Sequence, residues 1–228
     1  MARKPLLFVI CSDQPRNGKT LLARVLTDFL LLEGHDPFLI DLSHPEGTLR
    51  GYFPGRTALV DFAHVSGQMK AFDTIMAAPN RDYVIDVAAP HLPIFLEAAT
   101  DLGFIPEIRR LGLDSVVFYI IDKDEESLRA AAQAEALLLP DLFIPVRSDF
   151  VGSALPPGFG GLTITVPALE PEILDIVSSR RFSFRTFLLG EEAAVPLRLR
   201  PELKTFLGAI IDRFRDIDPA LSLLKLHG

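Results

Sequence analysis

The sequence has one cysteine, no long apolar run and fewer basic than acidic residues, and each of these shortages excludes a class of protein. A lone cysteine, Cys11, allows no disulfide within the chain, which is typical of a reducing compartment. No stretch reaches the roughly 18 apolar residues of a membrane-spanning helix. The apolar run at 6–10 is too short for the core of a signal peptide. We therefore expect a soluble, cytoplasmic protein.

Charge and cysteine content also bound the partners. The chain has 30 acidic and 23 basic side chains, so its net charge of −7 offers no general surface for non-specific binding to nucleic acid. It has no cysteine pair of the kind that holds zinc or an iron–sulfur cluster, which argues against metal-cluster delivery. Arginines do gather in one region, as contacts to DNA or as a solvated helix face: Arg180, Arg181, Arg185, Arg198 and Arg200.

Apolar, β-branched runs alternate with longer helical patterns along most of the chain. Strands are predicted at 6–10, 38–42, 58–62, 83–87, 115–121, 142–146 and 162–166, and helices at 18–33, 67–77, 93–102 and 125–139. Ser66 is the expected N-cap of the second helix. This alternation predicts an α/β fold, a doubly wound, mostly parallel sheet with helices on both faces, as in P-loop NTPases and Rossmann-like proteins.

The alternation stops after Pro167, where two further stretches look helical. The second carries an apolar stripe made of Leu203, Phe206, Leu207, Ile210, Ile211 and Phe214. Packing on the sheet is the ordinary explanation of such a stripe, and a helix on a membrane surface is the alternative. The segment at 154–161, rich in proline and glycine, is expected to be a surface loop because a strand pattern follows it. We therefore predict a single domain over 1–228, with helices of about 168–228 packed on it.

The first strand leads into the polar stretch SDQPRNGKT and then into a helix, which is the setting of a phosphate-binding loop. Gly18, Lys19 and Thr20 supply the second half of the pattern G-x-x-x-x-G-K-[ST], whereas Asp13 stands at the opening glycine. The lysine reaches phosphate oxygens and the threonine binds Mg²⁺, at a helix N-terminus that favours anions. The predicted nucleotide-binding segment comprises Asp13, Gln14, Pro15, Arg16, Asn17, Gly18, Lys19, Thr20 and Leu21.

Two further strands end in aspartate. FLID ends at Asp41 and YVID ends at Asp86. Because the carboxyl ends of parallel strands share one edge of a sheet, both aspartates should lie near Lys19 and Thr20. Carboxylate and hydroxyl oxygens are the ligands that Mg²⁺ prefers. The expected metal ligands are therefore Thr20, Asp41 and Asp86.

These motifs resemble the ParA/MinD-like branch of P-loop ATPases, the SIMIBI class with a deviant Walker A loop. The family loop x-K-G-G-x-G-K-[ST] corresponds to DQPRNGKT at 13–20. The family's D-x-D-P-Q-G corresponds to DLSHPEG at 41–47, and its D-x-x-P to DVAAP at 86–90. With two weaker motifs further on, the resemblance extends over about 5–175. It implies ATP and Mg²⁺ as ligands and an ATP-dependent homodimer.

The resemblance also assigns roles, and it shows where this chain departs from the family. Lys19 and Asp41 are expected to act in catalysis. The signature lysine, which reaches the phosphates of the partner subunit, is replaced by Gln14. Three roles are open for Arg16. It could take over the role of that lysine, it could bind the nucleotide of its own subunit, or it could face solvent. Ser43 stands where the family has the aspartate that orients the attacking water, which predicts slow hydrolysis.

The base of the nucleotide is less well defined by the sequence. Asp149 follows the strand at 142–146, where the family often has an asparagine, and it could accept a hydrogen bond from an amino group of the base. ATP rather than GTP is therefore taken from the resemblance.

Three functions follow. The first is a nucleotide-switched ATPase that positions or partitions DNA, a protein complex or a surface machine. The second is a non-hydrolysing nucleotide-binding regulator or scaffold with a degenerate loop. The third is a small-molecule ligase similar to dethiobiotin synthetase. The segment after the second strand resembles a switch region and favours the first two.

Overall fold

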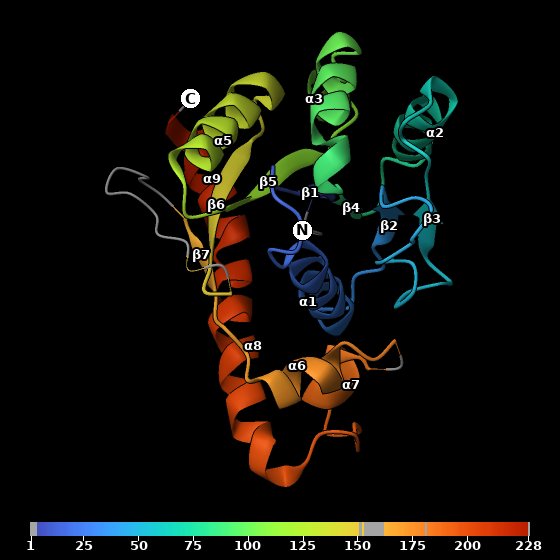
Figure 1. Cartoon of the computed structure of the whole chain (residues 1–228). Helices are drawn as coiled ribbons and strands as arrows, with labels where there is room; N and C mark the ends of the chain where they lie inside the picture. The colour runs from blue at the N-terminus through green and yellow to red at the C-terminus, as the bar shows by residue number, and fades with distance from the viewer. Residues whose placement is uncertain (1–3, 151, 153–161, 181, 228) are drawn as a thin grey trace.

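Seven parallel strands form one sheet in the order β3-β2-β4-β1-β5-β6-β7 (Figure 1). The structure is a computed structural model, and it describes residues 4–150, 152, 162–180 and 182–227. The strands are β1 (Leu6–Cys11), β2 (Phe38–Asp41), β3 (Thr57–Leu59), β4 (Tyr83–Asp86), β5 (Asp114–Ile121), β6 (Leu142–Ser148) and β7 (Ile164–Val166). Each lies within three residues of its predicted limits, so the predicted α/β class and parallel sheet are confirmed.

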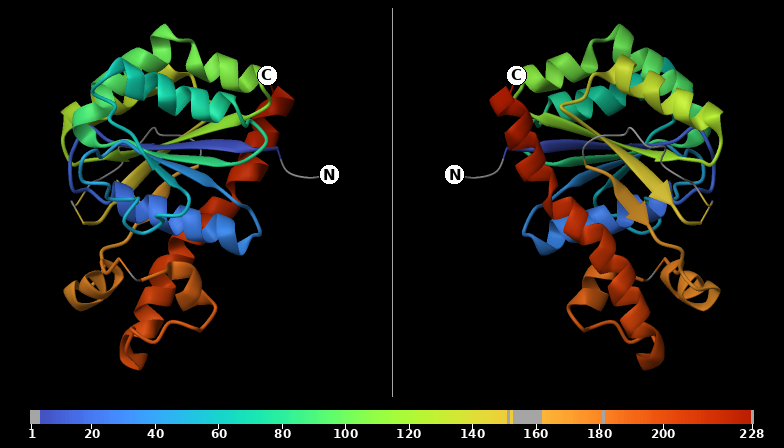
Figure 2. Two further views of the ribbon diagram at one scale, coloured as in Figure 1. Left: turned by 90° about the vertical axis from the view of Figure 1, so that its right-hand side faces the viewer. Right: turned by 90° about the vertical axis from the view of Figure 1, so that its left-hand side faces the viewer.

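Helices cover both faces of the sheet (Figure 2). One face is covered by α1 (Lys19–Leu32) and α8 (Arg200–Arg215), and the other by α2 (Val65–Met76), α3 (Leu92–Asp101), α4 (Phe104–Arg110) and α5 (Glu125–Leu138). Side chains of the central strand β1 alternate between the two layers, with Phe8 and Ile10 on the α1 side and Leu7 and Val9 on the other. The sheet is thus buried on both faces, which explains its nearly continuous apolar strands.

The C-terminal segment forms α6 (Pro171–Val177), α7 (Phe184–Leu188), the short 3-10 helix η2 (Leu197–Leu199), α8 and α9 (Ile217–His227). The predicted apolar stripe of α8 is buried in the core on the α1 side. The Phe214 ring lies 5.6 Å from that of Phe29 and 5.9 Å from that of Phe118. The stripe is therefore explained by packing and not by a membrane surface. In the described part of the chain, every helix is too short or too polar to span a bilayer.

Several local expectations were wrong. The second helix begins at Val65 with His64 as its N-cap, so Ser66 lies inside the first turn and does not cap it. A Cβ at Gly67 would come within 1.9 Å of the Asp61 carbonyl oxygen, so the start of α2 is fixed by close backbone packing that a cap rule does not consider. The helix α4 and the 3-10 helix η1 (Ala89–His91) were not predicted. The expected loop at 154–161 and Arg181 lie outside the described residues.

Candidate nucleotide-binding site

The loop between β1 and α1 is curled by two left-handed residues. Gly18, the N-cap of α1, has φ = 102°, a conformation that favours glycine. Arg16 has φ = 58°, which is uncommon for a residue with a side chain. Backbone strain of this kind is often found at ligand-binding loops. The curl leaves Pro15 and Arg16 exposed at the rim and buries Asn17 beneath them.

The curled loop encloses the side chain of Lys19. Its Nζ donates to the backbone oxygen of Gln14 at 2.6 Å and to Oδ1 of Asn17 at 3.2 Å. The amide of Asn17 donates in turn to Oγ of Ser12. Burial lowers the pKa of Lys19, and the nearby Asp86 opposes this effect. A phosphate oxygen is a stronger partner for an ammonium than neutral carbonyl oxygens are, so this lysine is poised to bind an anion.

Thr20 and Asp86 join the loop to the end of β4. The Thr20 hydroxyl donates to Oδ2 of Asp86 at 2.7 Å. Burial raises the pKa of Asp86 to about 6; the Thr20 hydrogen bond lowers it, Asp41 raises it and Lys19 lowers it. A buried carboxylate beside a lysine and a hydroxyl is short of positive charge, and its oxygens suit Mg²⁺. The residues present therefore fit a magnesium ion at this position.

Asp41 lies beside Asp86, because the two residues are paired between β2 and β4. Its carboxylate is fully buried, and it accepts hydrogen bonds from residues of the following loop. Oδ1 accepts from the backbone nitrogen and the hydroxyl of Ser43, at 2.9 and 2.6 Å, and Oδ2 accepts from the backbone nitrogen of Arg50 at 2.9 Å. The Ser43 hydroxyl also lies 2.9 Å from that of Thr48. The roles of Asp41 in metal binding and of Ser43 in water orientation remain predictions.

Asp13, at the place of the opening glycine, is held by side chains of β5 and α5. Its Oδ1 accepts from the hydroxyl of Tyr119 at 3.0 Å and from that of Ser127 at 2.7 Å. Its Oδ2 accepts from the amide of Gln14 at 3.0 Å. The departure from glycine is thus matched by partners about a hundred residues away. Sequence reasoning missed Tyr119 and Ser127, since no local pattern connects them with the loop.

A cleft of about 490 Å³ opens above these residues, within the size range of small-molecule sites. Its walls come from three segments that follow β1, β2 and β4. They contribute Pro15, Arg16, Lys19 and Thr20, then Ser43, His44, Glu46 and Thr48, and finally Asp86, Ala88, Ala89, Pro90 and His91. The cleft thus combines Arg16 and Lys19 with two histidines and two acids. Sequence reasoning did not select His91, although it follows the strand that ends in Asp86.

The structure brings some of the predicted residues together and leaves others apart. Arg16, Lys19, Thr20, Ser43 and Asp86 line the cleft, whereas Asp41 lies below it. The half-buried Leu21 packs against the core on the α1 side.

The predicted base contact lies outside the walls of the cleft. Asp149 follows the end of β6 and pairs with Arg147 at 3.3 Å. The end of β6 does approach the loop, since a Cβ at Gly18 would lie 4.0 Å from Oγ of Ser148. Asp149 as a contact to the base remains a prediction.

Comparison with solved structures shows the fold. A chain of the MinC:MinD cell division protein complex of Aquifex aeolicus is 15% identical, with a TM-score of 0.54 over 93% of this chain and 95% of that one. The MinD cell division protein of the same organism is 16% identical, with a TM-score of 0.53 over 93% and 96%. A plasmid partition protein from Borrelia burgdorferi is 15% identical, with a TM-score of 0.49 over 83% and 100%.

The chain matches no protein-family model and no curated protein in sequence. The similarity therefore lies in the fold, which is shared with the MinD cell division protein along almost the whole chain. The fold implied by the sequence motifs is confirmed.

Proposed function

We propose that this protein is a nucleotide-switched ATPase of the ParA/MinD-like kind, which binds ATP with Mg²⁺ in the cleft and dimerises to position or partition a partner. The arrangement of Lys19, Thr20 and Asp86 carries the proposal. A buried ammonium, a hydroxyl and a carboxylate meet at the start of a helix and at the carboxyl edge of a parallel sheet. The fold shared with MinD supports it.

In this proposal, different side chains bind the phosphates and the metal. Lys19 would exchange the Gln14 carbonyl for phosphate oxygens, and Thr20 with Asp86 would hold the metal. A bound Mg²⁺ neutralises charge on the phosphates. Transfer of a phosphoryl group depends mainly on positioning and on charge neutralisation, so these three residues would supply most of what the reaction needs.

Arg16 is the residue that we propose contacts the nucleotide across the dimer interface. It is exposed at the rim of the cleft and held in a left-handed conformation, where its guanidinium could bind phosphate oxygens of either subunit. The proposal predicts that the triphosphate, and not the diphosphate, shifts wild type from monomer to dimer in light scattering. Arg16→Ala should bind nucleotide but remain monomeric. An Arg16→Ala protein that dimerises like wild type would show that Arg16 does not act across the dimer.

A protein is the partner that we propose, because one of the similar structures is a complex of MinD with MinC. The arginine region gives DNA less support. Arg198 pairs with Glu172, and Arg200 donates to the backbone oxygens of Val195 and Glu192. These contacts neutralise or occupy two of the cations that a phosphate backbone would need.

A non-hydrolysing regulator is the second candidate, and one observation favours it. The Ser43 hydroxyl is held by Asp41 and Thr48, so it is already engaged where the family has a water-orienting aspartate. Both candidates bind nucleotide, and turnover separates them. Slow release of phosphate that stops in Lys19→Ala supports the ATPase. Tight binding with no turnover above that of Lys19→Ala supports the regulator.

The decisive experiment is calorimetric titration of ATP with Mg²⁺ into wild type, Lys19→Ala and Lys70→Ala. Lys70 is exposed on α2, outside the cleft, and is the matched control for loss of one lysine. We expect wild type and Lys70→Ala to bind alike and Lys19→Ala to lose binding by a hundredfold or more, since charge-assisted contacts to phosphate are the strong ones. Circular dichroism checks that all three are folded. A wild type that does not bind would refute the proposal.

A further inference from the structure

His91 joins two of the three segments that form the cleft. It lies in η1, directly after β4, and it is half-buried among the residues that line the cleft. Its Nδ1 lies 2.6 Å from the backbone oxygen of Leu42, which follows β2. The same imidazole therefore touches the segment that carries Ser43 and belongs to the segment that carries Asp86. A contact of this kind links the ends of β2 and β4, two neighbouring strands on one side of β1 and its loop.

The contact with Leu42 fixes which ring nitrogen of His91 carries a hydrogen when the ring is neutral. A carbonyl oxygen only accepts hydrogen bonds, so Nδ1 must carry a hydrogen and donate it. In the neutral ring, Nε2 then has a lone pair and repels anionic oxygens. When the ring is protonated, Nε2 becomes a second donor. The described residues provide no hydrogen bond to this nitrogen, while His91 borders the cleft.

The charges around the cleft explain why such a donor would matter. The groups that line it and carry or can gain charge are Arg16 and Lys19 from the loop and α1, His44 and Glu46 from the segment after β2, and Asp86 from β4. Two fixed cations face two acids, so the side chains of the cleft add little positive charge for a triphosphate beyond that of the proposed Mg²⁺. His44 lies 3.7 Å from Asp61, which is outside the cleft walls.

We propose that protonated His91 binds the terminal phosphate of the nucleotide through Nε2 and makes the cleft prefer a triphosphate over a diphosphate. The inference rests on the proposed function and names the residue that reads the number of phosphates. Binding of the triphosphate through Nε2 then takes up a proton, because only the protonated imidazole donates from Nδ1 and Nε2 together. The contact with Leu42 would transmit the occupied state to the segment after β2.

The experiment compares wild type with His91→Asn. An asparagine amide can still donate to the Leu42 oxygen, but it cannot gain a proton or supply the second donor. His64→Asn is the matched control, because His64 is exposed, pairs with Asp61 and does not line the cleft. Calorimetry with a non-hydrolysable ATP analogue and with ADP, each with Mg²⁺, gives the affinity ratio. Repeating it in two buffers of different ionisation enthalpy gives the protons taken up.

We expect wild type and His64→Asn to prefer the triphosphate, with more proton uptake for it than for the diphosphate. His91→Asn should keep its affinity for ADP and lose about tenfold or more of the preference, the size of one hydrogen bond to a charged group. Its extra proton uptake should disappear, which separates His91 from Asp86 and from the nucleotide itself. An unchanged ratio and unchanged uptake in His91→Asn would overturn the inference alone. A wild type that binds neither nucleotide would overturn the proposed function as well.

Discussion

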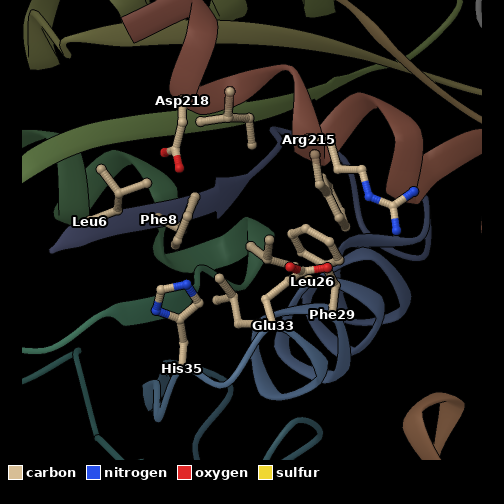
Figure 3. Close-up of a pocket in the computed structure, with 11 residues that line it drawn as sticks. Leu6, Phe8, Leu26, Phe29, Glu33, His35, Arg215 and Asp218 are labelled. Atoms are coloured by element: carbon tan, nitrogen blue, oxygen red, sulfur yellow. The ribbon is translucent and has the colours of Figure 1, made fainter. Parts of the chain in front are cut away.

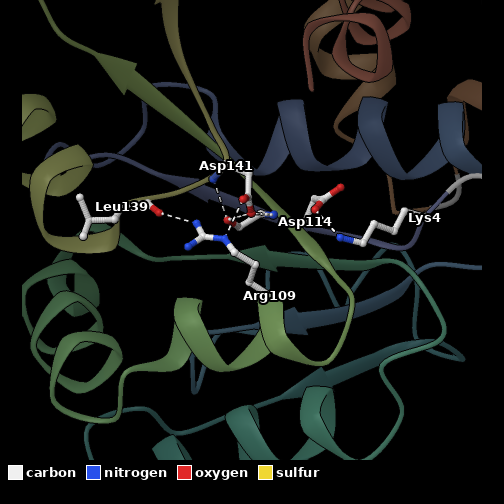
Figure 4. A network of polar contacts seen from close by, with 6 residues as sticks. Lys4, Arg109, Asp114, Leu139 and Asp141 are labelled. Atoms are coloured by element: carbon white, nitrogen blue, oxygen red, sulfur yellow. Dashed lines mark hydrogen bonds and ion pairs between the residues drawn. The ribbon is translucent and has the colours of Figure 1, made fainter. Parts of the chain in front are cut away.

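The two edges of the sheet carry the same kinds of side chain and use them differently. At the amino edge, Asp141 accepts from the backbone nitrogen and the hydroxyl of Ser115, both at 2.8 Å, and from Nε of Arg109 at 2.8 Å (Figure 4). Asp114 nearby accepts from Nζ of Lys4 at 2.8 Å. Both carboxylate oxygens of Asp141 thus accept hydrogen bonds within the fold. These bonds connect the start of β5 with the residue that precedes β6.

Asp86, at the carboxyl edge, is the contrasting case. Its carboxylate accepts a hydrogen bond from the Thr20 hydroxyl, and burial raises its pKa to about 6. The spaces at the two edges also differ. A cavity of about 180 Å³ at the amino edge is lined by apolar side chains such as Leu6, Phe8 and Leu26 together with Glu33, His35, Arg215 and Asp218 (Figure 3). The cleft at the carboxyl edge is larger, about 490 Å³, and its lining includes both Arg16 and Lys19. A strand-end aspartate therefore indicates a binding site when the fold leaves its charge poorly compensated.

The largest effect is expected for Phe214→Ala, at the amino-edge cavity. Phe214 is 3% exposed and its ring packs between those of Phe29 and Phe118. Removing a buried aromatic side chain costs about 3–5 kcal/mol, so chemical denaturation should show that loss in the free energy of unfolding. Leu189→Ala, at an exposed position of the same C-terminal segment, should cost little. Nucleotide affinity of the folded variant should not change. A loss of nucleotide affinity in the folded variant would mean that packing at the amino edge affects binding at the carboxyl edge.

Asp86→Asn should raise the free energy of unfolding at neutral pH, whereas Phe214→Ala lowers it. With the pKa raised to about 6 against 3.8 for the unfolded chain, the folded state keeps its proton longer, so stability falls as pH rises from about 4 to 6. Above pH 6 the full penalty is present, about 3 kcal/mol in order of magnitude. The variant should therefore be more stable than wild type at pH 7 and similar below pH 4, without magnesium. Thermal denaturation against pH measures this, and a difference that does not depend on pH contradicts it.

A magnesium titration completes that test. Wild type should gain stability from nucleotide with Mg²⁺, because a ligand that binds only the folded state shifts the equilibrium toward it. Asp86→Asn should gain much less. Stability and function would then oppose each other at one carboxylate, which is common at binding sites.

Asp141→Ala is expected to have a moderate effect at the amino edge. It removes the acceptor of the Ser115 backbone nitrogen, and Ser115 is fully buried, so an unsatisfied donor would cost about 1–3 kcal/mol. The loss should be visible in denaturant unfolding, with nucleotide binding unchanged. Glu125→Ala, which breaks an exposed ion pair with Arg129, is the control and should cost under about 1 kcal/mol. Similar losses in both variants would contradict the structural role assigned to Asp141.

Sequence reasoning predicted the sheet because apolar strands and helices of different period alternate along the chain. It also placed Lys19, Thr20 and Asp86 at one edge, since a loop that precedes a helix and a strand that ends in aspartate are local signals. It could not distinguish Asp41 from Asp86, because FLID and YVID are equivalent as sequence. The difference arises when the chain after β2 turns back and Arg50 donates to Asp41.

Contacts that span a hundred residues were beyond the sequence for the same reason. In the sequence, Asp13 is only a departure from the opening glycine of the phosphate-binding loop. The fold shows that Tyr119 and Ser127 donate hydrogen bonds to its carboxylate. His91 carried no local signal beyond its place after a strand, and its role in the proposal depends on the oxygen of Leu42. Local patterns therefore placed residues at the carboxyl edge of the sheet, and tertiary packing decided which of their side chains contact one another.

The smallest effect, and the closest comparison of the two edges, comes from two buried tyrosines. The Tyr119 hydroxyl donates to Asp13 at 3.0 Å, beside the candidate site, and that of Tyr83 donates to the backbone oxygen of Ala78 at 2.9 Å, away from it. Tyr119→Phe also removes the acceptor of the Asp13 backbone nitrogen, and Tyr83→Phe also removes a contact to the backbone oxygen of Thr74. Each change should therefore cost about 1 kcal/mol or slightly more of unfolding free energy. Only Tyr119→Phe should also weaken nucleotide binding, by up to about tenfold, because it loosens the start of the loop. Calorimetry on both variants decides whether Asp13 serves the loop: equal nucleotide affinities would mean that its network stabilises the fold and nothing more.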